Sequence, residues 1–180
     1  MQVFRSVNDL EDYVIANLSK HITGDYHLLD TPNYPNAGDQ LIWQGQLDFL
    51  KSIPFKCLST SDDIFFSYPV LKKQNNILLQ GGGNFGDLYD NHQNFRKNVI
   101  KRYKHNRIVM FPQSVHFNNE HNLKKELEVF NSHDELILCA RDSYSFDFFN
   151  TYCKNALVLL MPDMAFCSKL TLNSKVKVSD

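Results

Sequence analysis

The sequence predicts an α/β protein with a Rossmann-like parallel β-sheet covered by helices on both faces. Short apolar segments alternate along the chain with longer segments whose apolar residues recur every three or four positions. The short segments lack the alternation of a half-exposed strand, which is typical of strands buried on both faces. Hydrophobic residues make up 43% of the 180 residues and charged residues 22%, so the chain can form one sizeable core.

The first part of the chain predicts two helices and three strands. Both helices carry apolar residues on one face, and the first follows Ser6, which can cap its N-terminus. Two prolines and a glycine mark a loop before the second helix. The expected elements are a helix at 6–20, a strand at 26–29, a helix at 39–51, and strands at 55–58 and 76–80.

The second part of the chain repeats helix and strand three times. Its helices carry apolar residues four positions apart, and its strands are short apolar runs. The expected elements are a helix at 89–104, a strand at 107–111 stopped by Pro112, a helix at 120–131, a strand at 135–140, a helix at 142–152 and a strand at 156–160. We expect one domain over residues 1–170 and a polar tail or linker stub over 171–180.

Composition and charge exclude several classes of protein. The formal net charge of -1 gives no general attraction to nucleic acid, so we expect no nucleic-acid partner. No apolar run is long enough to cross a bilayer, and the N-terminus shows no secretory signal. The 4 cysteines lack metal-binding spacing. We therefore expect a cytoplasmic protein with reduced thiols and no metal.

A glycine-rich stretch follows the strand expected at 76–80. Four of the 7 glycines lie between Gly81 and Gly86. Glycine lets another group approach the main chain, and a loop that leads into a helix offers N–H groups to an anion. A tight turn without a ligand explains a lone glycine stretch equally well.

Four other expected strands also end in compact polar groups. In an open α/β sheet, ligands bind beyond the carboxyl ends of the strands. The groups are Asn36-Ala37-Gly38-Asp39, Pro112-Gln113-Ser114, Arg141-Asp142-Ser143-Tyr144-Ser145 and Pro162-Asp163-Met164-Ala165-Phe166.

Each of these groups also has a structural explanation. Asp39 and Asp142 could cap helices, and Ser145 could be an ordinary first-turn residue. An ion pair of Arg141 with Asp142 or Asp163 could brace the loops instead of binding a ligand.

Three further features also have explanations that involve no ligand. Gln113 could satisfy loop backbone, and His116 is best explained as a solvated loop histidine. A basic run is interpreted as a solvated helix face, with contact to anionic lipid at the inner membrane leaflet as its functional alternative. It consists of Arg96, Lys97, Lys101, Arg102, Lys104, His105 and Arg107.

The polar groups and the glycine stretch, in this order, resemble the motifs of polysaccharide pyruvyl transferases. The resemblance spans about residues 30–168 and corresponds to the N-terminal half of the family. It implies one half of a GT-B-type two-domain transferase, whose two Rossmann-like halves enclose the active cleft. We therefore expect the second domain to be absent from this chain.

The resemblance also implies a reaction. Family members transfer the enolpyruvyl unit of phosphoenolpyruvate to two sugar hydroxyls, which leaves a cyclic ketal and phosphate. The implied role is exopolysaccharide or cell-envelope polysaccharide biosynthesis, with phosphoenolpyruvate as donor substrate, no cofactor and a sugar or lipid-linked glycan as acceptor. A separate second-half domain or self-association would complete the cleft. The alternatives are half of a nucleotide-sugar glycosyltransferase and a non-catalytic carbohydrate-binding remnant.

The resemblance assigns roles to the residues at the strand ends. Arg141 is expected to hold the donor's carboxylate or phosphate, and Asp39 to act as a base or to accept a hydrogen bond from a sugar hydroxyl. No residue stands out as the general acid. The expected substrate-binding residues are Asn36, Gly38, Gly81, Gly82, Gly83, Asn84, Gln113, Ser114, Asp142, Ser145 and Asp163.

Overall fold

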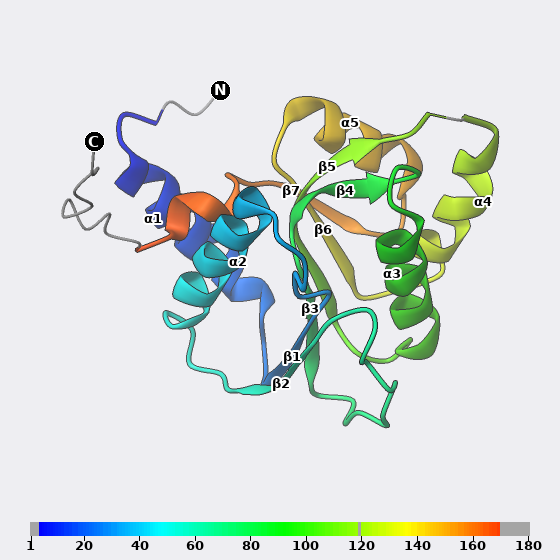
Figure 1. Ribbon diagram of the computed structural model, residues 1–180, viewed down its shortest axis with the longest axis horizontal. Helices are drawn as coiled ribbons and strands as arrows, with labels where there is room; N and C mark the ends of the chain where they lie inside the picture. The colour runs from blue at the N-terminus through cyan, green and yellow to red at the C-terminus, as the bar shows by residue number, and fades with distance from the viewer. Residues whose placement is uncertain (1–3, 119, 170–180) are drawn as a thin grey trace, which may run out of the picture.

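A parallel β-sheet forms the centre of the protein (Figure 1). The computed structural model describes residues 4–118 and 120–169. The sheet has 7 strands in the order β2-β1-β3-β5-β6-β7, with β4 paired to β5, and every pair is parallel. The strands are β1 (Tyr26–Leu29), β2 (Cys57–Ser61), β3 (Asn76–Leu79), β4 (Gly82–Gly86), β5 (Ile108–His116), β6 (Leu136–Ala140) and β7 (Leu157–Leu160).

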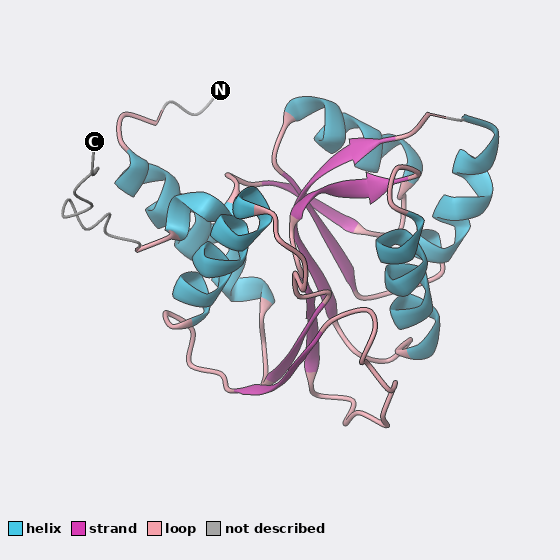
Figure 2. Cartoon of the chain, in the orientation of Figure 1, coloured by secondary structure: helices cyan, strands magenta, loops and turns pink. Residues whose placement is uncertain are grey.

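Helices cover both faces of this sheet (Figure 2). Helices α1 and α2, with the short 3₁₀ helix η2, pack on one face, and α3, α4 and α5 pack on the other. Their bounds are α1 (Val7–Leu18), η1 (Ser19–His21), α2 (Ala37–Leu50), α3 (Asp90–Arg102), α4 (Glu120–Asn131), α5 (Ser143–Tyr152) and η2 (Met164–Cys167). The predicted Rossmann-like fold class is confirmed, and the tail predicted at 171–180 lies outside the described residues.

The two faces of β3 show why its residues do not alternate between apolar and polar. Leu78 packs into the cluster formed with α1 and α2, whereas Ile77 and Leu79 pack into the cluster formed with α3, α4 and α5. All three side chains are fully buried. A strand enclosed by helices on both sides needs an apolar residue at every position, so the continuous apolar run is the expected signature.

Close packing of α2 against η2 fixes the start of α2 relative to the sheet. A Cβ atom added to Gly45 would lie 1.8 Å from the carbonyl oxygen of Met164. No side chain fits at that distance, so glycine allows the two backbones to touch. This contact holds the N-terminus of α2 at the carboxyl edge of the sheet, where the candidate site lies.

The glycine stretch and the strand after α3 differ from the prediction. Gly82 to Gly86 form strand β4, so the loop expected there is wrong, whereas α3 begins at Asp90, one residue after the predicted start. Binding of an anion by these glycines stays a prediction. Strand β5 also continues through Pro112 to His116. Proline is tolerated because its missing N–H falls where the pairing with β6 shifts register, between Met110 and Gln113.

The predicted solvated basic face is wrong for Arg96, which is fully buried and paired with Asp30. Lys97 pairs with Glu126 and Arg107 with Glu135, so the basic run is partly neutralised. Within the described ranges, no helix is both long and apolar enough to cross a membrane. Contact of the remaining basic side chains with lipid stays a prediction.

His133 provides the first testable prediction about stability. Its side chain is almost completely buried, with Nε2 3.1 Å from the carbonyl oxygen of Tyr103. The N–H of Glu135 donates to Nδ1 over 3.1 Å. His133→Ala leaves the N–H of Glu135 without this partner inside the protein and removes one of two hydrogen bonds to the carbonyl of Tyr103, which also accepts from the N–H of Asn106. We therefore expect it to lower the free energy of unfolding by about 2 kcal/mol. Urea denaturation measures the loss.

The matched control is His105→Ala, which removes an exposed histidine from the same region. Equal stability of the two variants would contradict the prediction. Burial lowers the pKa of His133 below 6.5 and holds the ring neutral. The unfolded chain therefore binds this proton first, and the contribution of His133 is complete above about pH 6.5 and falls as the pH drops below that value.

Candidate functional site

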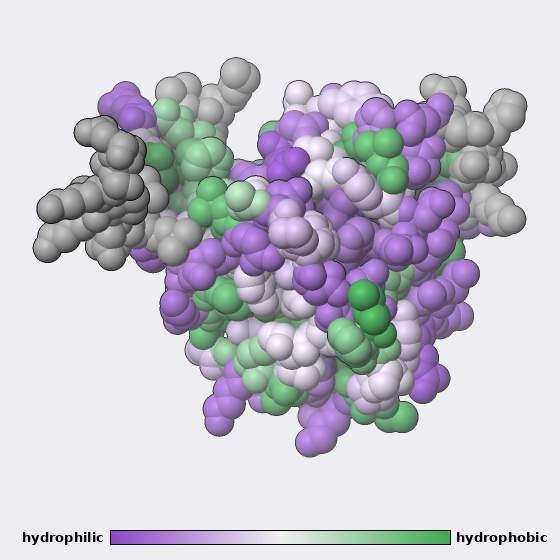
Figure 3. Space-filling view, in the orientation of Figure 1, coloured by the Kyte–Doolittle hydropathy of each residue, from purple (hydrophilic) through white to green (hydrophobic). Residues whose placement is uncertain are grey.

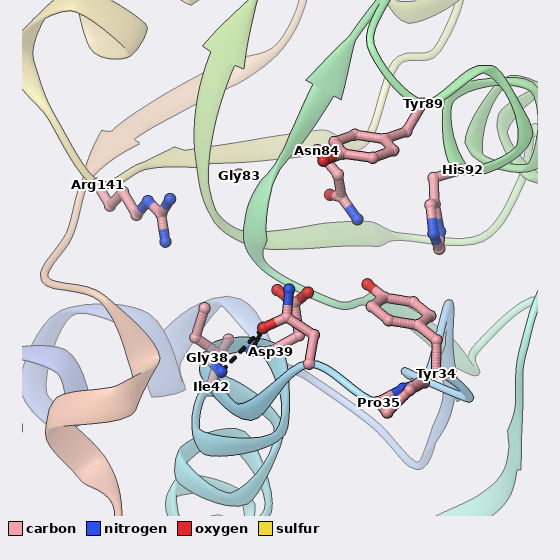
Figure 4. A pocket seen from close by; sticks show the side chains of 11 residues that line it. Tyr34, Pro35, Gly38, Asp39, Ile42, Gly83, Asn84, Tyr89, His92 and Arg141 are labelled. Carbon is pink, nitrogen blue, oxygen red and sulfur yellow. Dashed lines mark hydrogen bonds between the residues drawn. The ribbon is translucent and has the colours of Figure 1, made fainter.

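A cleft of about 570 Å³ opens at the carboxyl edge of the sheet (Figure 4). It lies where the strand order reverses, since β2 and β3 lie on opposite sides of β1. Such a switch point is the usual ligand site of an open α/β sheet. The cleft is lined by Tyr34, Pro35, Asn36, Gly38, Asp39, Ile42, Gly83, Asn84, Tyr89, His92 and Arg141.

The N-terminus of α2 places Asp39 in the cleft. Asn36, not Asp39, caps the helix, because its Oδ1 accepts hydrogen bonds from the N–H groups of Gly38 at 2.9 Å and Asp39 at 3.2 Å. The capping role considered for Asp39 is therefore filled by Asn36. The Asp39 carboxylate lies beside Gly82, where an added Cβ would be 3.4 Å from Oδ1. Burial and the hydrogen-bonded Asp39 carboxylate both raise the pKa of Tyr34.

Arg141 lies at the other end of the cleft from His92, with Asp39 between them (Figure 4). Its Nη1 pairs with Oδ2 of Asp163 at 2.6 Å, and its Nε donates to Oγ of Ser114 at 2.7 Å. The bracing ion pair considered from the sequence is present. Arg141 still lines the cleft. Its Nη2 lies close to Gly83, where an added Cβ would be 3.1 Å away. Glycine at this position therefore leaves space in front of the arginine.

Several predicted binding residues hold Arg141 in place and do not line the cleft. The Ser114 hydroxyl donates to Asp142 Oδ2 over 2.7 Å, and Asp142 Oδ1 caps α5 by accepting from the N–H of Ser145. The Ser145 hydroxyl accepts from the buried N–H of Val115. Burial opposes ionisation of Asp142, but hydrogen bonds from Ser114 and Ser145 keep its pKa below the ordinary value. These residues form a rigid support behind the arginine.

Gly81 and Gln113 also lie outside the cleft. The Gly81 N–H donates to Oε1 of Gln46 over 2.8 Å and is buried. The Gln113 side chain is fully buried and its Nε2 donates to the carbonyl oxygen of Gln80 over 2.6 Å. Both groups are used within the protein, so Gln113 satisfies loop backbone, the alternative considered for it from the sequence.

The sequence did not reveal a buried network at the His92 end of the cleft. Oδ1 of Asp30 lies 2.7 Å from Nδ1 of His92, and Oδ2 accepts from Nε of Arg96 over 2.8 Å. Nη2 of Arg96 donates to Oδ1 of Asn84 over 2.6 Å. Two signals were available: Asp30 directly follows β1, and His92 and Arg96 are four residues apart on α3.

The comparisons with known proteins identify the family. A family model described as polysaccharide pyruvyl transferase matches residues 36–179. This chain belongs to the polysaccharide pyruvyl transferase family. The matched region begins at the α2 cap and includes most of the cleft, whereas Asp30 and Tyr34 precede it. The resemblance inferred from the strand-end motifs is therefore confirmed.

Individual relatives of the pyruvyl transferase family support the assignment. The chain is 35% identical over 155 residues to the putative pyruvyl transferase EpsO of Bacillus subtilis, covering 84% of this chain and 46% of the relative. It is 30% identical over 149 residues to pyruvyl transferase 1 of Schizosaccharomyces pombe, covering 77% of this chain and 37% of the relative. The chain thus spans less than half the length of these relatives.

The side chains that line this pyruvyl transferase-family cleft include one that can bind an anion. A guanidinium, a carboxylate, two asparagine side chains, an imidazole and two tyrosine rings border one space. Within residues 4–118 and 120–169, no three His, Cys, Asp or Glu side chains are grouped so that they could hold a metal ion. Guanidinium groups bind carboxylates and phosphates, so Arg141 is the group in this cleft suited to an anion.

Proposed function

We propose that this chain forms part of the active site of an enzyme that transfers pyruvate from phosphoenolpyruvate to two hydroxyl groups of a sugar. The product is a cyclic ketal within an exopolysaccharide or cell-envelope polysaccharide. The observation that carries the proposal is the braced guanidinium of Arg141, which borders the same cleft as the Asp39 carboxylate. Membership of the pyruvyl transferase family and the names of its relatives support it.

We assign the two substrates to the two ends of the cleft. Arg141 would hold the phosphate or carboxylate of phosphoenolpyruvate, because its ion pair and hydrogen bond fix the guanidinium before the substrate arrives. The acceptor sugar would lie against Tyr34 and Tyr89 at the opposite end. Asp39 lies between these ends and would accept a hydrogen bond from an acceptor hydroxyl, which turns that oxygen toward the donor.

In this proposal, groups from outside the described cleft would complete the site. A separate second-half domain or another copy of the chain would supply the remaining wall. On the face in Figure 3, hydrophobic side chains form small groups among hydrophilic ones. Exposed Phe65, Val70 and Leu88 are available for such contacts. The reaction would occur in the cytoplasm, with the lipid-linked acceptor held at the inner face of the membrane.

Calorimetry with phosphoenolpyruvate tests the proposal. We expect saturable binding by the chain and, with a lipid-linked glycan present, release of inorganic phosphate and incorporation of labelled pyruvate. Lack of phosphoenolpyruvate binding, alone and with a second-half partner, would overturn the proposal. Binding of a UDP- or GDP-sugar in its place would indicate half of a nucleotide-sugar glycosyltransferase.

A further inference from the structure

Asp30, His92 and Arg96 form a buried charged group that borders the cleft. The Arg96 side chain is 0% exposed and the Asp30 side chain 1%, whereas the His92 side chain is 14% exposed and lines the cleft. Burying a charged pair costs solvation free energy, which the hydrogen bonds must offset. Asp30 also adopts φ 64°, a conformation that non-glycine residues rarely take. Such a strained, buried arrangement at a cleft indicates a function.

The contacts of Asp30 determine which ring nitrogen of His92 is left to exchange a proton with a ligand in the cleft. Arg96 binds Oδ2 of Asp30, and Oδ1 lies 2.7 Å from Nδ1 of His92. A carboxylate accepts hydrogen bonds, so Nδ1 of His92 carries the proton and donates it to Asp30. The ring nitrogen that exchanges protons with a ligand is then Nε2. The ring of Tyr34 packs edge-on against the imidazole, with centroids 5.6 Å apart, and fixes its plane.

We propose that His92 is the catalytic base that takes the proton from an acceptor hydroxyl, with Asp30 and Arg96 as its positioning residues. This inference rests on the proposed pyruvyl transfer. His92 and the two tyrosine rings lie at the end of the cleft opposite Arg141, with Asp39 between the two ends (Figure 4). With phosphoenolpyruvate bound to Arg141 and a sugar bound against those rings, the attacking hydroxyl would lie between the donor and His92.

The proposed role balances protons and bonds. The first acceptor oxygen bonds to C2 of phosphoenolpyruvate while its proton moves to Nε2 of His92, and the C2=C3 electron pair takes a proton from water at C3. The C2–O bond to phosphate then breaks, and His92 returns its proton to the departing phosphate oxygen. The second hydroxyl bonds to C2 and loses its proton to the hydroxide that remained when water protonated C3, which restores the water. One base serves both steps because the attacking and leaving oxygens are bound to the same carbon.

The groups around His92 act on its pKa in opposite directions, and the net effect is to raise it. The hydrogen bond to Asp30 raises the pKa of His92, whereas burial and Arg96 oppose this rise and Asp63 adds to it. Tyr34 and Tyr89 border the same space. Because a base must be neutral, activity should fall as the pH drops below the pKa of His92. Removing the Asp30 charge should lower that pKa and move the acid limb of the pH profile to lower pH.

The test compares His92→Asn with the wild-type chain and its acceptor glycan. Asparagine keeps an N–H near the position of Nδ1, so the contact with Asp30 is preserved while Nε2 is lost. We expect phosphate release to fall about 100- to 10,000-fold. Phosphoenolpyruvate affinity, measured by calorimetry, should change less than about threefold, because Arg141 is untouched. His116→Asn is the matched control, since His116 is exposed at the end of β5 and outside the cleft.

Asp30→Asn provides a second test, the pH dependence of activity. A purely structural role of His92 would leave this pH dependence unchanged. We expect NMR titration of the His92 ring to give a lower pKa in this variant than in the wild type, with a matching shift in the acid limb of activity. Wild-type phosphate release by His92→Asn, or an unchanged pH profile in an active Asp30→Asn variant, would overturn the inference. A wild-type chain that binds no phosphoenolpyruvate would instead overturn the proposed function and this inference with it.

Discussion

Replacing Arg96 with leucine is expected to lower the free energy of unfolding by about 3–5 kcal/mol. Among the described residues, Arg96 is the largest fully buried side chain, and its guanidinium contacts Asp30 and both the carbonyl and side-chain oxygens of Asn84. Leucine cannot replace these hydrogen bonds, so the Asp30 carboxylate would lose its cationic partner while it remains buried. Chemical denaturation followed by circular dichroism measures the loss.

Lys97→Leu is the control for this substitution because Lys97 follows Arg96 on α3 and also forms an ion pair. Its pair with Glu126 is partly exposed, with side chains 15% and 26% accessible, so we expect a loss below about 1 kcal/mol. Adding Asp30→Asn to Arg96→Leu should recover part of the stability, because it removes the unpaired charge and asparagine tolerates positive φ. Equal losses for the two single variants would contradict the argument.

Most helices and strands could be predicted from the sequence, because each depends on the pattern of apolar residues within its own segment. Strands β3, β5 and β6 are enclosed on both faces, so their apolar runs identify them without an alignment. Strand β4 could not be identified in this way. Its glycine-rich residues have low strand propensity, and its pairing with β5 depends on how closely two backbones approach. A Cβ on Gly86, for example, would lie 1.6 Å from the carbonyl oxygen of His116.

The candidate site was predictable where topology alone determines position. Asp39 and Arg141 follow strands of one parallel sheet, so their presence at one edge follows from the fold. The direction of each side chain does not follow from the fold. Gln113 comes just beyond the strand predicted at 107–111 and points into the interior, where it bonds to Gln80.

The Asp30–Arg96 pair shows a second limit of sequence reasoning. These residues are 66 positions apart and belong to different elements, so no short motif connects them. The periodicity of α3 correctly places Phe95 and Val99 in the core, but it leaves Arg96 looking like part of a solvated basic run. Arg96 is buried because it pairs with the carboxylate of Asp30 at the end of β1. Only the folded structure brings these two residues into contact.

Replacing Arg141 with glutamine is expected to weaken phosphoenolpyruvate binding about 100-fold, or about 2.7 kcal/mol. Glutamine removes the charge but retains a donor amide, so the variant isolates the loss of a charge-assisted contact to the anion. The side chains of Arg141 and Asp163 are 26% and 20% exposed, so water screens their pair and we expect the stability to fall by less than about 1 kcal/mol. Calorimetry and thermal denaturation measure the two effects separately.

Arg107→Gln is the matched control because Arg107 also pairs with a carboxylate, that of Glu135, but lies at the opposite, amino end of β5. Its loss should leave phosphoenolpyruvate affinity unchanged. Equal weakening by both variants would indicate attraction of the anion by overall charge instead of a site. Unchanged affinity in Arg141→Gln would show that Arg141 does not bind phosphoenolpyruvate in this cleft. Selective weakening supports a donor site organised by the Ser114–Arg141–Asp163 brace, which already holds the guanidinium in position in the chain alone.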